Sequence, residues 1–215
     1  MNLILPSYSF VILTIIMTVF YCKKRIKSDE TTLYSCLLTI SLLNVVFNII
    51  GIYMGYNNGN MHFLLFLNHL DLPLYFWWAS ILLTYLLYNI ITDKKLYIKT
   101  KKYIFIMNCI FTLVTIFLPF EVVINKDAGY AIGMCVNFVY FISGMYLLCS
   151  IISSVILVKN EKIKQAIPLF AILVFGVLVA LIQKVNPAII GVPTMIVLIE
   201  LIMYFTIENP DVKMM

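Results

Sequence analysis

The stretch LYSCLLTISLLNVVFNIIGIYMGY, residues 33–56, contains no Asp, Glu, Lys or Arg. It follows the basic run KKRIK at 23–27 and gives way to the polar run NNGN at 57–60. A helix needs about 20 mainly apolar residues to cross roughly 30 Å of hydrocarbon, and this stretch is long enough to do so. Residues 33–56 therefore predict a transmembrane helix.

The rest of the chain has the same apolar character. Of its 215 residues, 63% are hydrophobic and 12% are charged, and that charged share is about half of what a typical soluble domain carries. Because backbone groups in lipid must be hydrogen-bonded within their own segment, the apolar blocks are expected to be helical. We expect an all-α integral membrane protein, a bundle of seven transmembrane helices, with spans at about 3–22, 33–56, 63–91, 103–123, 130–158, 166–183 and 188–207.

The basic residues predict the orientation of this bundle. The loops after the first, third and fifth blocks, together with the C-terminal segment, hold all of the 15 Lys and Arg residues except Lys126 and Lys184. Cytoplasmic loops of membrane proteins carry such an excess of Lys and Arg. The N-terminus is therefore expected outside and the C-terminus in the cytoplasm. Short basic runs between apolar blocks do not favour nucleic-acid binding, and the lipid bilayer is the expected partner.

Polar residues inside a span are functional candidates, because their insertion is costly. The stretch FLNHLDLPLYFWW, 66–78, places Asn68, His69 and Asp71 in the outer third of the third span. His69 and Asp71 are two residues apart and diverge on a helix, so they should contact different neighbours. His62 and His69 share a face and could hold a metal or haem, but His62 lies at the water boundary. A hydrogen-bonded interface histidine is the preferred interpretation, and neither a metal nor a cofactor is expected.

Glu200 is the second candidate, since it lies well inside the seventh span. A carboxyl group there is either protonated or paired. Two interpretations remain open: a helix–helix hydrogen bond, or a conformational switch that links the bundle to the C-terminal end. One helix face carries Pro193, Val197, Glu200 and Tyr204.

Asparagines within spans commonly join helices by hydrogen bonds. Asn44 and Asn48 are four residues apart and form one stripe, and Asn108 and Asn137 lie in the fourth and fifth blocks. We expect Asn44, Asn48 and Asn137 at helix interfaces.

The sequence lacks the motifs that are typical of several classes of protein. The chain has no H-E-x-x-H, P-loop, G-x-G-x-x-G or G-x-S-x-G motif, and its carboxylates are too separated for an obvious acid–base pair, so no enzyme activity is expected. The last span has no central lysine, which disfavours a retinal-type receptor. Pro73 and Pro193 interrupt the third and seventh spans, but their flanking sequences do not match as transporter repeats would. A small-solute permease remains an alternative.

Four stretches resemble the membrane sensor region of a family of sensor histidine kinases from low-GC Gram-positive bacteria. They are CKKRIKSDETTLYSCLL (22–38), GYAIGMCVNFVYFISGMYLL (129–148), IPLFAILVFGVLVALIQKVNP (167–187) and IELIMYFTIENPDVKM (199–214), the last being the closest match. The third span departs from the family, because NHLDLPLYFWW stands where a more basic and aromatic NKIYLIY type is expected. If that span lines the sensing pocket, the stimulus differs from that of relatives.

The resemblance implies a sensory module of a two-component system in a bacterial plasma membrane. In such proteins the last span continues through TIENPD into a cytoplasmic coiled coil, a phosphoacceptor-histidine domain and an ATP-binding domain. This sequence contains none of those catalytic parts, and His62 and His69 lie on the outer side, so the chain is expected to sense a stimulus without phosphorylating anything.

The last residues are expected to begin a cytoplasmic output linker over 208–215. An amide that can cap a helix, a proline and an acid have the composition of a helix restart. The stimulus is an unidentified small molecule or a membrane property, and the partners considered are a second copy bound through the seventh span and a separate kinase that the chain would regulate as a subunit. The output connector consists of Glu208, Asn209, Pro210 and Asp211.

Overall fold

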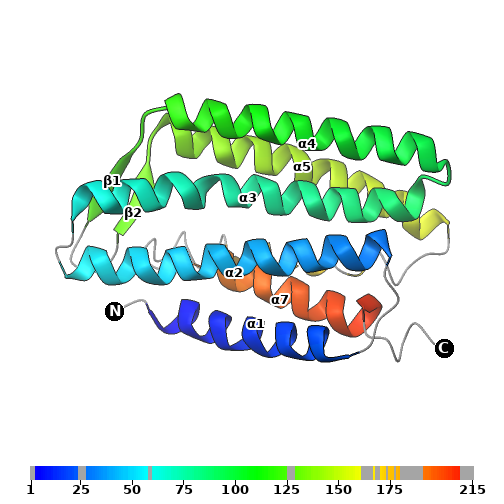
Figure 1. Ribbon diagram of the computed structural model, residues 1–215, viewed down its shortest axis with the longest axis horizontal. Helices are drawn as coiled ribbons and strands as arrows, with labels where there is room; N and C mark the ends of the chain where they lie inside the picture. Colours follow the sequence, from blue (N-terminus) through cyan, green and yellow to red (C-terminus); the bar gives the residue numbers. More distant parts are fainter. Residues whose placement is uncertain are drawn as a thin grey trace.

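A computed structural model describes residues 3–23, 28–57, 60–124, 129–160 and 191–208, together with 167, 170–172, 174–176, 178 and 179. The chain folds into long helices and one short β-hairpin (Figure 1). The helices are α1 (Ile4–Cys22), α2 (Asp29–Tyr56), α3 (Met61–Ile90), α4 (Lys94–Phe117), α5 (Met134–Lys159) and α7 (Val192–Met203), which continues as a π-helical turn, η1 (Tyr204–Glu208).

Five of these helices, α1 to α5, are long and apolar enough to cross a membrane. The chain is therefore a helical multi-pass membrane protein, as its composition predicts. Helix α7 is apolar but shorter. Half of the predicted sixth span, 166–183, and the start of the seventh, 188–190, lie outside the described residues, so the count of seven spans stays a prediction.

Polar caps explain why two helices start before their apolar blocks. The Ser28 hydroxyl accepts the backbone N–H of Thr31 at 3.1 Å, so α2 begins at Asp29. The Asp93 carboxylate accepts the N–H of Lys95 at 2.9 Å, so α4 begins at the basic loop rather than at 103. A side-chain acceptor at this position satisfies a backbone donor that the first turn leaves unpaired.

The predicted end of the fourth span is wrong. Helix α4 stops at Phe117, and β1 (Glu121–Ile124) then pairs antiparallel with β2 (Gly129–Ile132), with Glu121 opposite Ile132. The apolar block 103–123 runs into β1 because its β-branched residues are apolar as well, and such residues favour strands.

Gly133 joins this hairpin to α5. Its φ is +123°, a backbone conformation that side chains rarely adopt. A Cβ there would lie 3.0 Å from Phe120 Cα and 3.1 Å from the Pro119 oxygen. The same Pro119 oxygen accepts the N–H of Cys135 at 3.2 Å, so the start of α5 is fixed against the end of α4.

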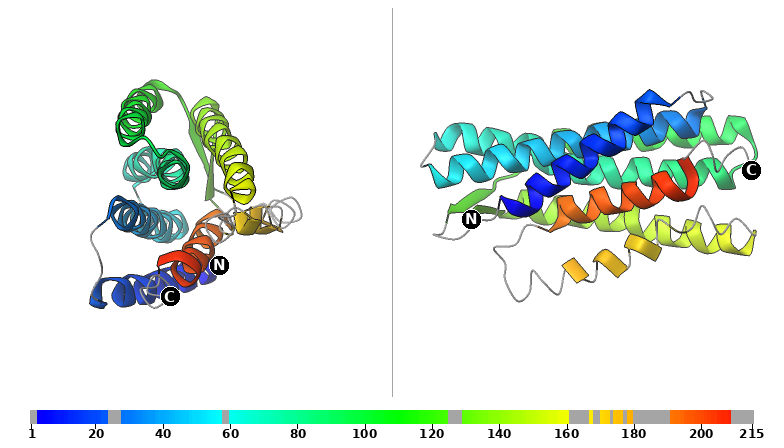
Figure 2. Two further views of the ribbon diagram at one scale, coloured as in Figure 1. Left: turned by 90° about the vertical axis from the view of Figure 1, so that its right-hand side faces the viewer. Right: turned by 90° about the horizontal axis from the view of Figure 1, so that it is seen from below.

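Helix α3 lies at the centre of the bundle and packs against α2, α4 and α5. Helix α1 packs against α2 and α7, and α7 also contacts α2. The end-on view in Figure 2 shows α4 and α5 on one side of the α2–α3 pair and α1 and α7 on the other. Helix α3 passes through Pro73 without ending, so the proline does not interrupt it.

The two ends of the bundle differ in charge. We call the end with β1 and β2 the hairpin end, and the end where α2 and α4 begin the far end (Figure 1). In the part of the chain that the structure describes, every lysine lies toward the far end, namely Lys23, Lys94, Lys95, Lys99, Lys101, Lys102 and Lys159.

Candidate functional site

Glu200 connects α7 to the centre of the bundle. Its side chain is fully buried, and Oε1 accepts hydrogen bonds from the Ser41 hydroxyl on α2 and from Trp78 Nε1 on α3, the latter at 2.9 Å. The Tyr34 hydroxyl donates to the Glu200 backbone oxygen at 2.8 Å. The carboxyl Oε2 is buried and accepts no hydrogen bond. One residue of α7 is thus held by two neighbouring helices, and we call these four residues the Glu200 cluster.

The partners of Glu200 are neutral donors. Glu200 is the one charged residue between Val192 and Met203, in a helix that packs mainly through apolar side chains and through Thr194, which accepts the Ser9 hydroxyl of α1 at 2.9 Å. A buried polar group is costly unless it is hydrogen-bonded, so the donors on α2 and α3 fix the rotation of α7 about its axis. The helix–helix hydrogen bond considered from sequence is therefore present, and the switch role stays a prediction.

Asp71 forms a second cluster nearer the hairpin end. Its Oδ1 accepts the side-chain amide of Asn44 at 2.7 Å, and its Oδ2 accepts that of Asn48 at 3.1 Å. The Asn44 side chain is 2% exposed, and its Oδ1 is buried and accepts no hydrogen bond. We call Asn44, Asn48 and Asp71 the Asp71 cluster; its two asparagines lie at the α2–α3 interface.

His69 and Asn68 do not join Asp71. The His69 ring lies 3.3 Å from the Leu65 backbone oxygen and packs edge-on against Phe120, with ring centroids 4.4 Å apart. The Asn68 amide donates to the Leu64 backbone oxygen at 2.9 Å, within its own helix. In the described ranges, no three His, Cys, Asp or Glu side chains gather where they could hold a metal ion.

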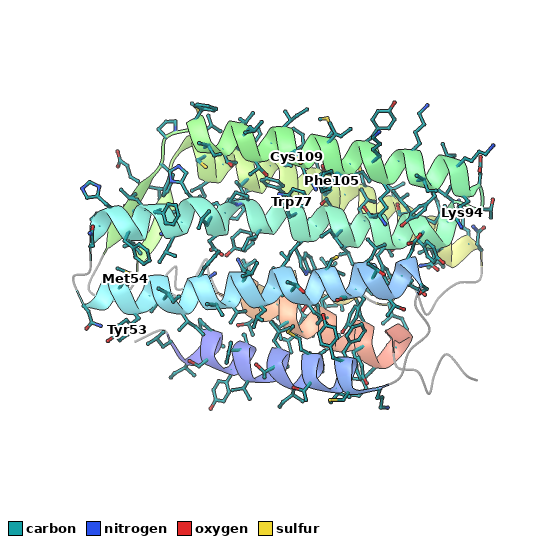
Figure 3. All side chains as sticks on the ribbon, in the orientation of Figure 1. Tyr53, Met54, Trp77, Lys94, Phe105 and Cys109 are labelled. Atoms are coloured by element: carbon teal, nitrogen blue, oxygen red, sulfur yellow. The ribbon has the colours of Figure 1, made fainter. Side chains whose placement is uncertain are left out.

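A third polar cluster joins α3, α4 and α5. Asn108 is buried, donates to the Ser80 hydroxyl and accepts the Tyr146 hydroxyl at 2.9 Å. Nearby, Trp77 Nε1 donates to the Thr112 hydroxyl at 3.0 Å. Figure 3 shows Trp77 and Phe105 between α3 and α4, where their rings meet edge-on.

Asn137 does not take the interface position predicted for it. Its side chain is exposed in the first turn of α5, just after the hairpin. The sequence position inside an apolar block could not show which face of α5 packs inward, and Asn108 on α4 has the interface role instead.

The two carboxyl clusters share one helix interface. On α2, Asn44 follows Ser41 by three residues and Asn48 follows it by seven, and this spacing places all three on one face of the helix. Asp71 and Trp78 are seven residues apart on α3, about 10 Å along the helix. The stripe of Asn44 and Asn48 was visible in the sequence, and extending it by three residues identifies Ser41; the roles of Tyr34 and Trp78 had no comparable signal.

The output connector is only partly described. The backbone of Glu208 ends η1, whereas Asn209, Pro210 and Asp211 lie outside the described residues. Between Val192 and Thr206 the one exposed residue is Phe205, so α7 presents little free surface, and a homodimer through this helix stays a prediction. Single π-helical turns often occur at functional positions.

Comparison with known proteins gives no family or relative: no protein-family model, no curated protein and no solved structure matches this chain.

Proposed function

We propose that this chain is a membrane-embedded sensory module that detects a stimulus within the bundle or the bilayer and transmits it through α7. The observation that supports the proposal most directly is the Glu200 cluster. A single buried carboxyl group on α7 takes donors from both α2 and α3, so a change in the α2–α3 interface acts directly on α7. The sequence resemblance to sensor histidine kinases gives the class of output.

The mechanism is a shift between two packings of α7. In the packing described here, Ser41 and Trp78 hold Oε1 of Glu200. Hydrogen bonds between membrane helices contribute about 0.6 kcal/mol on average and up to about 1.7 kcal/mol, so this pair contributes about 1–3 kcal/mol. A stimulus that favours the second packing by a similar free energy moves α7 by rotation, tilt or translation.

The proposal includes orientation and output. The lysines of the described ranges lie toward the far end, which supports a cytoplasmic far end and an extracellular hairpin end in a bacterial plasma membrane. The module would then consist of seven spans, and α7 would pass its motion to a histidine kinase region, either on the same polypeptide or on a separate subunit.

A chimaera tests the transmission step. The full 215-residue chain is fused to the cytoplasmic region of a sensor histidine kinase, and autophosphorylation is measured in nanodiscs. Glu200→Gln and Ser41→Ala weaken the hydrogen bonds to α7. The loss of one such bond, about 0.6–1.7 kcal/mol, is expected to change basal autophosphorylation about three- to fifteenfold, since 1.4 kcal/mol corresponds to a factor of ten. Asn137→Ala, at an exposed position, is the matched control. Equal activity in all four chimaeras would refute the proposal.

A flux measurement separates the sensor from a small-solute permease. The chain is reconstituted in liposomes, and uptake of labelled amino acids, sugars and alkali cations is compared with protein-free liposomes. A sensor moves no solute across the bilayer. Uptake that depends on the chain and is lost in Asp71→Asn would support a permease and overturn the sensory proposal.

A further inference from the structure

The Asp71 cluster has an arrangement that the transmission mechanism does not use. Two side-chain amides donate to one carboxylate, at 2.7 and 3.1 Å, and the Oδ1 of Asn44 accepts nothing although its side chain is 2% exposed. A buried acceptor without a donor costs free energy. A half-turn of the Asn44 side-chain amide about its last torsion would exchange its nitrogen and oxygen, so that Oδ1 points at the Asp71 carboxylate. Two oxygen acceptors facing each other are favourable when a cation lies between them.

The cluster can offer a cation oxygen ligands. Asp71 supplies its two carboxylate oxygens, and once the side-chain amides that now donate to it turn over, Asn44 and Asn48 each supply one amide oxygen. Such hard ligands suit hard cations and not the transition metals that prefer imidazole or thiolate.

The single negative charge of the site favours a monovalent cation. Asp71 is the one carboxylate of the cluster, and among the described residues every lysine lies toward the far end of the bundle. His69, two residues from Asp71, packs on Phe120 and its own helix instead. The two amide donors carry no charge, so they leave the negative charge of Asp71 in place, and one monovalent cation neutralises it.

We propose that Asn44, Asn48 and Asp71 form a binding site for a small monovalent cation, either an alkali metal ion or a primary ammonium group, at the α2–α3 interface. Asp71 is half-buried and lies in the half of α3 nearer the hairpin end. Binding replaces the amide donors at the carboxylate with the cation and turns amide oxygens toward it.

The position of the site links it to Glu200. Asn44 follows Ser41 by three residues on α2, and Asp71 precedes Trp78 by seven on α3, so a change in helix spacing at the cation site extends to both donors of Glu200. The cation is thus the stimulus, or a co-ligand required by it. This coupling rests on the proposed sensory function, whereas the binding site itself does not.

Direct binding tests the site. Saturable binding of ²²Na⁺ to the purified full-length chain in nanodiscs is measured at constant ionic strength, with choline as the replacement cation. We expect saturable binding in the wild type, at least a tenfold loss of affinity in Asp71→Asn, and a change below twofold in Glu121→Gln, which removes an exposed carboxylate at the same end of the bundle. Asp71→Asn preserves side-chain shape, and circular dichroism verifies its fold.

Competition identifies the source of the cation. Displacement of ²²Na⁺ by unlabelled sodium or potassium at lower concentrations than by methylammonium assigns the site to alkali ions, and the reverse order assigns it to an organic ammonium; both orders support the proposal. Absence of saturable ²²Na⁺ binding in the wild-type chain overturns it without any variant. Wild-type affinity in Asp71→Asn overturns it as well.

Tryptophan fluorescence tests the coupling separately. The variant Trp77→Phe retains Trp78 alone, since the chain has two tryptophans. A sodium titration should change its emission with the same midpoint as ²²Na⁺ binding, and Asp71→Asn should abolish the change. If sodium binds without changing the fluorescence, the proposed binding site stands, but the proposed coupling between this site and Glu200 is wrong. If sodium binds but all four chimaeras signal equally, the sensory proposal fails and the cation site stands.

Discussion

Replacing Trp78 by phenylalanine tests the hydrogen bond between α3 and α7. Trp78 is 3% exposed, and its Nε1 donates to Glu200 Oε1 at 2.9 Å. Phenylalanine preserves an aromatic ring at this position but cannot donate. Ser41 continues to donate to the same oxygen, so the carboxyl group is not left without a partner.

The expected loss has two parts. The hydrogen bond contributes about 1–2 kcal/mol, between the upper values for membrane proteins and those for bonds to charged groups in soluble proteins. The smaller ring forfeits roughly 1 kcal/mol of packing and apolar burial. Trp78→Phe should therefore lower the free energy of unfolding by about 2–3 kcal/mol.

A double-mutant cycle isolates the hydrogen bond from the packing loss. Unfolding in mixed micelles is measured for Trp78→Phe, Glu200→Gln and the double variant, and the expected coupling energy is about 1–2 kcal/mol. Trp77 is the matched control, because it is the adjacent residue and of the same type but donates to Thr112 on α4 at 3.0 Å. The cycle of Trp77→Phe with Glu200→Gln should be additive to within about 0.5 kcal/mol.

The reasoning fails if the two tryptophans give equal coupling to Glu200. It fails as well if the Trp78 cycle is additive, because the packing of α7 would then not depend on the carboxyl contact.

Three further outcomes follow from individual positions. Asn108→Ala removes a buried amide with partners on two helices and should lower the free energy of unfolding by about 1–3 kcal/mol, whereas Asn137→Ala, at an exposed position, should change it by less than about 0.5 kcal/mol; equal effects would contradict the assignment. Gly133→Ala should destabilise by about 1–3 kcal/mol in the same unfolding assay because of its positive φ, and Gly144→Ala, which meets no atom within 4 Å inside α5, should be neutral or stabilising. Cys22, exposed at the end of α1 near the far end, should react with a membrane-impermeant maleimide only after the cells are permeabilised when it is the sole cysteine; labelling in intact cells would reverse the proposed orientation.

Apolar length made the helices predictable, whereas the polar caps that start α2 and α4 were not identified from the sequence. The first, second, third and fifth spans differ from the observed helices by a few residues, since an uncharged block such as 33–56 has few alternatives in lipid. The β-hairpin was missed because β1 contributes Val122 and Val123 to the apolar block 103–123, and the one charged residue there, Glu121, did not end the block. Hydrophobicity alone does not separate a helix from a strand there, and only the β-branched composition and Pro119 marked the change.

Side-chain partners were less predictable than spans. The positions of Asp71 and Glu200 inside apolar blocks identified them as residues that need partners. Which neighbours supply those partners depends on the order of helices around α3, and neither composition nor spacing contains that order. Trp78 illustrates the difficulty, because an indole in a span resembles any other apolar core residue until its N–H is seen to face a carboxyl group.

The contacts of Glu200 also have a consequence for biosynthesis. Tyr34, Ser41 and Trp78 are separated from Glu200 by 166, 159 and 122 residues, so the ribosome delivers all three donors to the membrane long before their acceptor. Until α7 arrives, Ser41 and Trp78 are in the membrane without the acceptor that Glu200 supplies. The contact of α7 with α2 and α3 therefore forms only after those two helices have been synthesised, and we expect substitutions at Glu200 to change the yield of assembled protein as well as the properties of the mature one.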